Sequence, residues 1–331
     1  MANFRLKKAE EIRDSTTQRM LKQIQIMYQE LYRDVSRRIT SGGGNSLSNQ
    51  NLILIQREIQ NRIKQINSDV ENNVRSNMET VCNAVTEDIR TYLKQMGFKD
   101  SDIAKAYIHI PAQIVDTIVT GQIYQEGWSL SKAIWGYNQK TQQTLQDIIT
   151  SGAGQGKGAY EIAKELESYV DPMAKKQAST IKKWRYARET DVQMGRAEYI
   201  GQRITDYYRP GKVDYNALRL ARTMVSHAYQ QTFERVNRYD PFVIGYRWLT
   251  SNFHGRVCSI CKDRATTDQY GLGQGVFPKD QLPLDHPNGM CTFEAVMSDS
   301  MEEIARKIGE WYQAPVGTFP DIDRYALDFV A

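Results

Sequence analysis

A long helical pattern in the first third of the chain limits the possible folds most. Residues 52–96 contain neither proline nor glycine, and apolar side chains recur along them at every third or fourth position. Ile59, Val70, Val81 and Tyr92 are each eleven residues apart, a period of about 3.67 residues per turn that keeps the apolar stripe on one side of a nearly straight helix. Because a single helix cannot bury such a stripe, a bundle partner or a second subunit must cover it.

Similar spacing predicts more helices on both sides of this segment. Residues 18–39 carry apolar side chains every three or four positions, and the glycine-rich run 41–49 ends that pattern, because glycine loses much conformational entropy in a helix. Residues 242–251, FVIGYRWLTS, are instead aromatic and β-branched, and they predict a strand. Further helices are expected at 112–126, 129–150, 159–169, 215–236 and 301–311.

The glycine-rich run 151–158, SGAGQGKG, has only a partial likeness to a phosphate-binding loop. Ser151 stands where the Walker pattern needs its first glycine, and Gly158 stands where that pattern needs a serine or threonine for magnesium. The run also lacks a preceding apolar strand. It is therefore interpreted as a linker between two helices.

Residues 174–188, AKKQASTIKKWRYAR, form a dense basic and aromatic segment without any acidic residue. Basic side chains neutralise phosphates and aromatic rings stack on bases, so the segment could bind nucleic acid. A solvated helix face in a linker is the simpler interpretation, and both stay open. The candidate nucleic-acid-binding residues are Lys175, Lys176, Lys182, Lys183, Trp184, Arg185 and Arg188.

Charge and hydropathy narrow the class of protein. The net charge of the 331 residues is +4, which is mild, so any contact with nucleic acid must come from a local patch. The first residues are charged rather than apolar, and no run approaches the ~20 apolar residues of a membrane span. We therefore expect an intracellular, reducing environment, in which four cysteines fit a metal site or free thiols better than disulfides.

Three of the four cysteines lie close together in the sequence. Cys258 and Cys261 are separated by two residues, and His286 and Cys291 follow after a further 24 residues. Thiolates and imidazole are the ligands of closed, tetrahedral zinc sites. The loop between the two pairs is glycine-rich and polar, so a metal that closed it would replace a missing core. The spacing predicts a structural zinc site with the ligands Cys258, Cys261, His286 and Cys291.

Two other interpretations of these thiols stay open. They could be reduced and simply packed, or Cys258 and Cys261 could be a redox pair, although the residues after Cys261 indicate a loop rather than the helix of a thioredoxin-like pair. His254 is an alternative fourth ligand. Elsewhere, Cys82 is expected to be a small buried hydrophobe, and His227 a packed or surface histidine.

Several motifs in the second half resemble the Mu F-like phage head morphogenesis proteins, also called minor capsid proteins. The motifs are Leu220-Ala-Arg-Thr, Tyr246-Arg-Trp-Leu-Thr, Val257-Cys-Ser-Ile-Cys and Leu284-Asp-His-Pro-Asn-Gly-Met-Cys. Upstream, Gly127-Trp-Ser-Leu, Ile134-Trp135 and Gln155-Gly-Lys-Gly are similar to the helical part of that family. The clear likeness covers residues 127–297. The chain departs from the family at Gly289, where the family usually has a cysteine, and at Met290, where it usually has an arginine.

The resemblance implies a structural role rather than an enzymatic one. Such proteins are present in few copies inside the phage head near the portal, and they assist head assembly or DNA delivery. The implied partners are the portal protein, other capsid proteins and packaged double-stranded DNA. A second copy of the chain is a further expected partner, because it could cover the long apolar stripe. The implied location is the capsid interior, and the host cytoplasm during assembly.

A nuclease is the main alternative. HNH endonucleases also combine a Cys-x-x-Cys pair with a downstream Asp-His, so His286 could be a general base and Asp285 a magnesium ligand. Those enzymes usually continue with a second Cys-x-x-Cys, whereas Cys291 is the last cysteine here. A DNA-binding zinc module is less favoured, because no basic recognition helix is expected beside Cys261.

These observations predict an α+β, mostly helical protein. A long helical arm and bundle is expected over 1–170, and a basic linker or helix over 171–214. A small C-terminal α/β domain that carries the metal knuckle is expected over 215–299. A terminal helix and an extended tail follow over 300–331.

Overall fold

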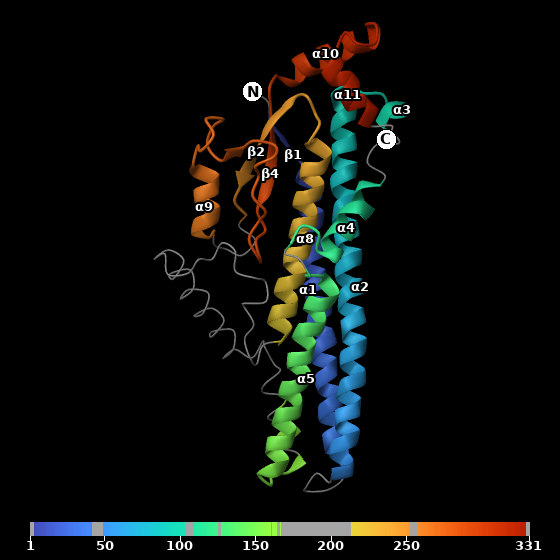
Figure 1. Cartoon of the computed structure of the whole chain (residues 1–331), viewed down its shortest axis with the longest axis vertical. Coiled ribbons are helices and arrows are strands. Elements are labelled where there is room, and N and C mark those ends of the chain that lie inside the picture. Colours follow the sequence, from blue (N-terminus) through green and yellow to red (C-terminus); the bar gives the residue numbers. More distant parts are fainter. Residues whose placement is uncertain are drawn as a thin grey trace. The chain divides into compact units, whose positions relative to one another are not determined.

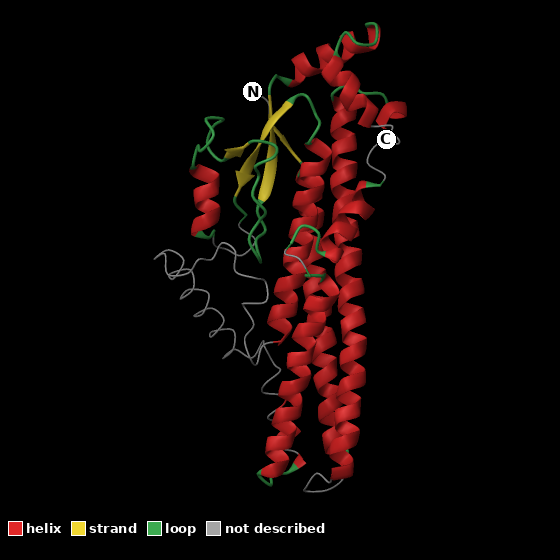
Figure 2. Cartoon of the chain, viewed as in Figure 1, coloured by secondary structure: helices red, strands yellow, loops and turns green. Residues whose placement is uncertain are grey.

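The protein is mostly helical and has one small antiparallel sheet (Figure 2). The computed structural model describes residues 3–41, 49–103, 109–124, 127–159, 161–163, 166, 213–251 and 257–328. These residues form two compact units, each made of discontinuous segments. Unit 1 contains Met1–Thr17, Ser76–Ile118 and Thr223–Ala331, and unit 2 contains Gln18–Arg75 and Val119–Arg222.

The two longest helices match the predicted apolar periodicity. Helix α1 is Lys7–Thr40 and helix α2 is Asn49–Gln95, so α1 begins eleven residues earlier than the sequence pattern predicts. Each predicted stripe residue of α2, from Ile59 to Tyr92, is at most 6% exposed. The prediction that the stripe is a packing surface is therefore confirmed.

A buried chain of hydrogen bonds joins three helices within unit 2. The Tyr28 hydroxyl on α1 donates to Asn138 Oδ1 at 2.7 Å, and Asn138 Nδ2 donates to Asn67 Oδ1 on α2 at 2.5 Å. Asn138 lies on α5, Leu130–Gly154, and is fully buried. Buried amides are costly unless they are hydrogen-bonded, so this layer favours one register of the three helices over its alternatives.

The second half of the glycine-rich run 151–158 connects two helical segments, as predicted, whereas residues 151–154 form the last turn of α5. Helix α5 ends at Gly154, Gly156 has a φ of 71°, and residues 159, 161–163 and 166 are again helical. A β-carbon at Gly152 would lie 2.7 Å from Ile162 Cγ1, so glycine allows the second segment to approach α5 closely. Helix α4, Ile110–Thr120, precedes α5 and matches the predicted helix at 112–126 in part.

The sheet of unit 1 has four strands in the order β1-β4-β2-β3. Strand β2, Val243–Leu249, is the predicted strand, and it pairs with β4, Thr292–Met297, and with the short β3, Val276–Phe277. Strand β1, Asn3–Arg5, pairs antiparallel with β4, with Phe4 opposite Ala295. The sequence patterns did not predict β1, which brings the first residues of the chain into the sheet.

Helix α8, Val213–Asn237, lies beside the sheet (Figure 1). Aromatic rings fill the space between them. The Phe233 ring lies 5.2 Å from the Tyr246 ring and 5.8 Å from the Phe293 ring. Trp248 and Phe293 meet edge to face at 5.1 Å. These side chains are almost fully buried and form the aromatic core between α8 and the sheet.

The C-terminal segment is helical where an extended tail was expected. Helix α10, Met301–Gln313, begins where the sequence predicts, and the Ser300 hydroxyl caps it by accepting a hydrogen bond from the Glu303 amide. The turn after it leads into α11, Pro320–Asp328, so the expectation of an extended tail over these residues is wrong. Trp311 Nε1 donates to Asp323 and the Tyr325 ring contacts Phe98, which gives α11 tertiary contacts that a sequence pattern does not reveal.

The compact units do not follow the sequential division expected from the sequence. Unit 1 combines residues 223–331 with 1–17 and with 76–118, which contain the short helix α3, Asp100–Ile103. Residues 171–212 of the expected basic linker lie outside the described residues. Within the part of the chain that is described, no helix is long and apolar enough to cross a membrane.

Burying a carboxylate on the α2 stripe should destabilise unit 2. Val70 is 1% exposed, and in Val70→Asp an unpaired charge would enter the packed face, at a cost of several kcal/mol. The matched control is Asn72→Asp, an exposed position on the same helix, where a change within about 0.5 kcal/mol is expected. Thermal unfolding measures both variants, and equal melting temperatures would contradict the packing role of the stripe.

Candidate metal centre

The Cys-x-x-Cys pair lies at the start of a short helix. Helix α9 is Ser259–Thr266, and Cys258 is its N-cap residue, with its sulfur accepting the Cys261 amide hydrogen at 3.3 Å. The expectation that a loop follows Cys261 is therefore wrong. A polar atom at an N-cap satisfies one of the free N–H groups of the first turn, and a thiolate sulfur can take that part. The helix start thus fixes both sulfurs on one short stretch of backbone.

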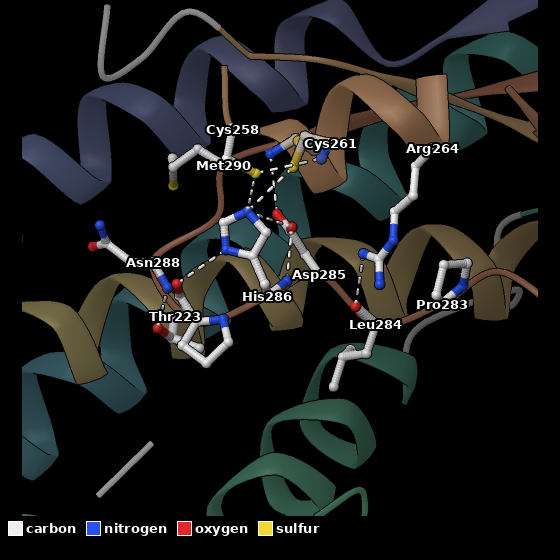
Figure 3. Close-up of polar contacts among 12 residues, drawn as sticks. Thr223, Cys258, Cys261, Arg264, Pro283, Leu284, Asp285, His286, Asn288 and Met290 are labelled. Atoms are coloured by element: carbon white, nitrogen blue, oxygen red, sulfur yellow. Dashed lines mark hydrogen bonds and ion pairs between the residues drawn. The ribbon is translucent and has the colours of Figure 1, made fainter. Parts of the chain in front are cut away.

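His286 lies against both sulfurs of this pair. Its Nε2 atom is 3.2 Å from Cys258 Sγ and 3.1 Å from Cys261 Sγ, and its Nδ1 atom is 3.1 Å from the Pro287 carbonyl oxygen. Figure 3 shows the ring facing the two cysteines. If Nδ1 carries the proton and donates it to that carbonyl, Nε2 presents its lone pair to the sulfurs, which is the tautomer that ligates a metal through Nε2.

Cys291 adds a third sulfur. Its Sγ atom lies 3.2 Å from Cys261 Sγ, and both side chains are buried. Cys258, Cys261 and His286 form one group that could hold a metal ion, and Cys261, Asp285 and Cys291 form a second. Cys261 belongs to both groups, so all four predicted ligands lie in one continuous cluster.

Asp285 holds the backbone of residues 285–291, the ligand loop, which carries His286 and Cys291. One carboxylate oxygen accepts the His286 amide hydrogen at 2.8 Å, and the other accepts the Cys291 amide hydrogen at 3.1 Å. The Asp285 amide in turn donates to the side-chain oxygen of Gln230 on α8 at 2.9 Å. Since Asp285 is 3% exposed, these bonds offset much of the cost of burying its carboxylate.

Two further residues of α8 hold the same loop. Thr223 Oγ1 accepts the Asn288 amide hydrogen at 2.8 Å, and the buried His227 Nε2 lies 2.9 Å from the Asp285 carbonyl oxygen. Burial lowers the pKa of His227 to about 4, even though the Asp285 carbonyl opposes the shift. His227 is therefore neutral near pH 7, and the prediction of a packed histidine is confirmed.

The turn between His286 and Cys291 requires an unusual backbone. Asn288 has a φ of 71°, a left-handed conformation that asparagine tolerates better than most residues. At Gly289, a β-carbon would lie 2.3 Å from the Asp285 carboxyl group. The carboxylate thus occupies the space that a side chain at position 289 would need.

The sulfurs and the imidazole change one another's protonation. A hydrogen bond with Cys261, followed by one with His286, lowers the pKa of Cys258, while the same bond and the neighbouring Cys291 raise the pKa of Cys261. Burial lowers the pKa of His286, but the Cys258 sulfur and the Asp285 charge outweigh it and raise the pKa to about 9. The cluster therefore favours a thiolate at Cys258 beside a protonated His286 imidazole. A bound cation would replace the proton on His286 Nε2 and the protons of the other thiols.

The distances between the donor atoms can be compared with those of a tetrahedral metal site. In a tetrahedral site with Zn–S bonds of about 2.3 Å and a Zn–N bond of about 2.0 Å, ligand atoms lie roughly 3.5–3.8 Å apart. The three contacts from Cys258 to His286, Cys261 to His286 and Cys291 to Cys261 are 3.1–3.2 Å, a fraction of an ångström closer. For one ion to be bound by all four N and S donors, the Cys291 side chain would turn toward Cys258 and His286, because Cys291 belongs to the second group.

Some predicted site residues lie outside the described part of the chain. They are His254, the alternative ligand, and Lys175, Lys176, Lys182, Lys183, Trp184, Arg185 and Arg188, the candidates for binding nucleic acid. Cys82 is fully buried, and its sulfur contacts the Ala228 carbonyl oxygen at 3.8 Å, as expected for a small packed residue.

Sequence reasoning missed the residues that support the ligands. Gln230 and Thr223 hold the ligand loop from α8, and Asp285 was considered only as a magnesium ligand. The signal for Thr223 was present, because it ends the Leu220-Ala-Arg-Thr motif.

No family model, curated protein or solved structure matches the chain.

A side chain at position 289 should disturb the ligand loop. In Gly289→Ala the new methyl group would overlap the Asp285 carboxylate, so the carboxylate must move away from the His286 and Cys291 amides. We expect a loss of about 1–3 kcal/mol in unfolding free energy and weaker metal binding. The control is Gly309→Ala on α10, where nothing lies within 4 Å of the added carbon. Equal metal binding and stability in both variants would contradict this account.

Proposed function

We propose that Cys258, Cys261, His286 and Cys291 bind one structural zinc ion that holds this part of unit 1 together. The observation that carries the proposal is the direct contact of the His286 imidazole with two cysteine sulfurs, one of which also touches the third. Buried, soft N and S donors in this number are the ligand set that closed zinc sites use. The bound ion would supply the cross-link between α9 and the loop before β4.

The protein groups around the cluster support a closed site. Asp285, Thr223 and Gln230 engage the backbone of the ligand loop, so the loop can present its ligands in a fixed direction. Fixed surroundings of this kind orient metal ligands and raise affinity. Asp285 remains outside the proposed ligand set because both of its oxygens already accept amide hydrogens.

A redox pair explains fewer of the observations. A thiolate at the start of a helix does fit such a pair, and Cys258 stands in that position. However, the imidazole between Cys258 and Cys261 and the third sulfur beside Cys261 have no part in a two-cysteine exchange. Metal binding accounts for all four side chains.

The nuclease alternative also fits the geometry less well. A general base needs a free nitrogen that faces its substrate, whereas His286 Nε2 faces two sulfurs and Nδ1 faces the Pro287 carbonyl. A magnesium ligand needs an available carboxylate oxygen, and the Asp285 side chain is 1% exposed with both oxygens hydrogen-bonded. We therefore favour a structural role for this cluster.

At the level of the whole protein, we propose a minor capsid protein that assists phage head assembly near the portal. The motifs that resemble the Mu F-like family supply this proposal, and the geometry supports it, because residues from three of those motifs meet at one cluster. Thr223, Cys258 and His286 are far apart in sequence but belong to the same network of contacts. Binding of packaged DNA through residues 175–188 is part of the same proposal.

Purified protein should contain about one zinc per chain. Cys261→Ser removes the sulfur shared by the two groups and should lose the metal, whereas Cys82→Ala, which changes the cysteine outside the cluster, should keep it. Chelation should lower the melting temperature, since free zinc at 1,000 times its Kd stabilises a folded state by about 4 kcal/mol. Elemental analysis and thermal unfolding measure both effects. Metal-free protein with unchanged stability would refute the proposed zinc site.

Association with the portal protein of the same phage tests the assembly role. We expect co-expressed portal protein to co-purify with the chain. A contact made by apolar helix faces should persist at about 1 M salt, because salt at that concentration screens only charge pairs. Binding to double-stranded DNA should instead weaken steeply with salt. Plasmid nicking with Mg²⁺ or Mn²⁺ that His286→Ala abolishes without unfolding the chain would favour the nuclease.

A further inference from the structure

Helix α1 places a buried arginine, Arg13, against the ligand loop. The Arg13 side chain is 0% exposed, although it comes from the opposite end of the sequence. Burying a guanidinium is costly unless its donors are used, so a fully buried arginine needs specific acceptors. In this molecule the acceptors on the loop are backbone carbonyl groups beside a metal ligand.

The two carbonyls that Arg13 contacts lie on either side of the Cys291 α-carbon. Arg13 Nη1 donates to the Cys291 carbonyl oxygen at 2.9 Å, and Nη2 donates to the Met290 carbonyl oxygen at 3.2 Å. These carbonyls belong to the two peptide planes that flank Cys291, and fixing both planes fixes its φ and ψ. With the backbone fixed, the direction of the Cα–Cβ bond is fixed as well. The guanidinium therefore sets the direction in which the Cys291 side chain leaves the backbone.

Other contacts hold the guanidinium in this orientation. Arg13 Nε and Nη2 both donate to Asp14 Oδ1, at 2.9 and 2.8 Å, and the guanidinium carbon lies 4.7 Å from the centre of the Tyr229 ring. A guanidinium that makes a forked pair and also lies over an aromatic ring has little rotational freedom. Lysine offers neither the fork nor the planar surface.

The segment before Arg13 is itself anchored in unit 1. Strand β1 pairs with β4, which begins directly after Cys291. Arg5 forms an ion pair with Glu10, and the Ala9 amide donates to Asp88 on α2 at 2.9 Å. Residues 3–17 thus have several independent attachments around the arginine.

We propose that Arg13 is a positioning residue for the Cys291 ligand, and that the metal affinity of the cluster depends on the segment 3–17. This inference rests on the proposed metal site, which it extends to a residue 278 positions away in sequence. It assigns a role to the first helix that neither the cysteine spacing nor the family motifs suggest.

The test compares Co²⁺ binding by the full-length chain and its variants. Co²⁺ takes the place of Zn²⁺ in sites with sulfur ligands and reports its ligands by light absorption. Arg13→Met should weaken Co²⁺ binding about 10- to 100-fold, the usual effect of losing a partner of a ligand. Arg13→Lys keeps the charge and an ammonium group that can donate to one of the two carbonyls, and should recover part of the affinity. Arg38→Met, an exposed arginine on the same helix, should bind as the wild type does.

The absorption bands distinguish a positioning role from general loss of folding. If Cys291 alone no longer binds Co²⁺ in Arg13→Met, the intensity of the thiolate-to-cobalt absorption should fall from that of three sulfur ligands to that of two. Cys258 and Cys261 would still bind the ion. Complete loss of the bands, in both Arg13→Met and Arg13→Lys, together with loss of helical circular dichroism, would overturn the positioning role. Wild-type affinity and bands in Arg13→Met would also overturn it and leave the zinc proposal intact. Wild-type protein that binds neither Co²⁺ nor Zn²⁺ refutes the metal site and this inference together.

Linkage gives a second, independent readout. If segment 3–17 strengthens metal binding, then metal must stabilise that segment to the same degree. Hydrogen exchange of a peptide from this segment should slow when Zn²⁺ is added to the wild type, and the slowing should disappear in Arg13→Met. An identical zinc effect on exchange in both proteins would contradict the proposed coupling.

Discussion

The buried carboxylate of Asp285 is the interaction on which the cluster depends. A carboxylate at 3% exposure is tolerated only if it is hydrogen-bonded, and Asp285 accepts the amide hydrogens of His286 and Cys291. Those two bonds close the loop between the last two proposed ligands and leave no room for a side chain at Gly289. Helix α8 then holds the closed loop from outside through Thr223 and Gln230. The cysteines thus lie on a backbone that protein groups already shape, and a metal would complete it.

The long helices have a different source of stability. Along α2, apolar residues from Ile59 to Tyr92 are buried at nearly every turn, so burial of apolar surface supplies most of the driving force. The polar layer of Tyr28, Asn138 and Asn67 selects one register of the three helices rather than adding much stability, because its hydrogen bonds form in that register alone. The region of the cysteines, in contrast, has long stretches without regular structure between α9 and β4, and hydrogen bonds to Asp285, Thr223 and Gln230 hold its backbone.

Periodic features could be predicted from the sequence, and long-range pairings could not. The apolar spacing located α2 and α8 to within a few residues, and the aromatic run located β2. The cysteine and histidine spacing selected four side chains that do lie together. Strand β1 escaped prediction because its three residues pair with β4 almost 300 positions later, and no local pattern records such a pairing. Helix α9 was missed because its cap is a cysteine, which is not among the usual N-cap residues.

The same long-range pairing orders the steps of folding. Strand β1 and Arg13 are synthesised long before their partners, Ala295 and the Cys291 carbonyl, which for Arg13 lies 278 positions later in the sequence. Closing a loop of this length costs entropy that only the final contacts can repay. The helices can form from local contacts before then, whereas β1 and Arg13 gain their partners only when β4 and Cys291 are in place. A metal bound by two cysteines of α9 and by His286 and Cys291 of this loop would therefore stabilise the long-range contacts of Cys291, and with them the attachment of residues 3–17 to the sheet.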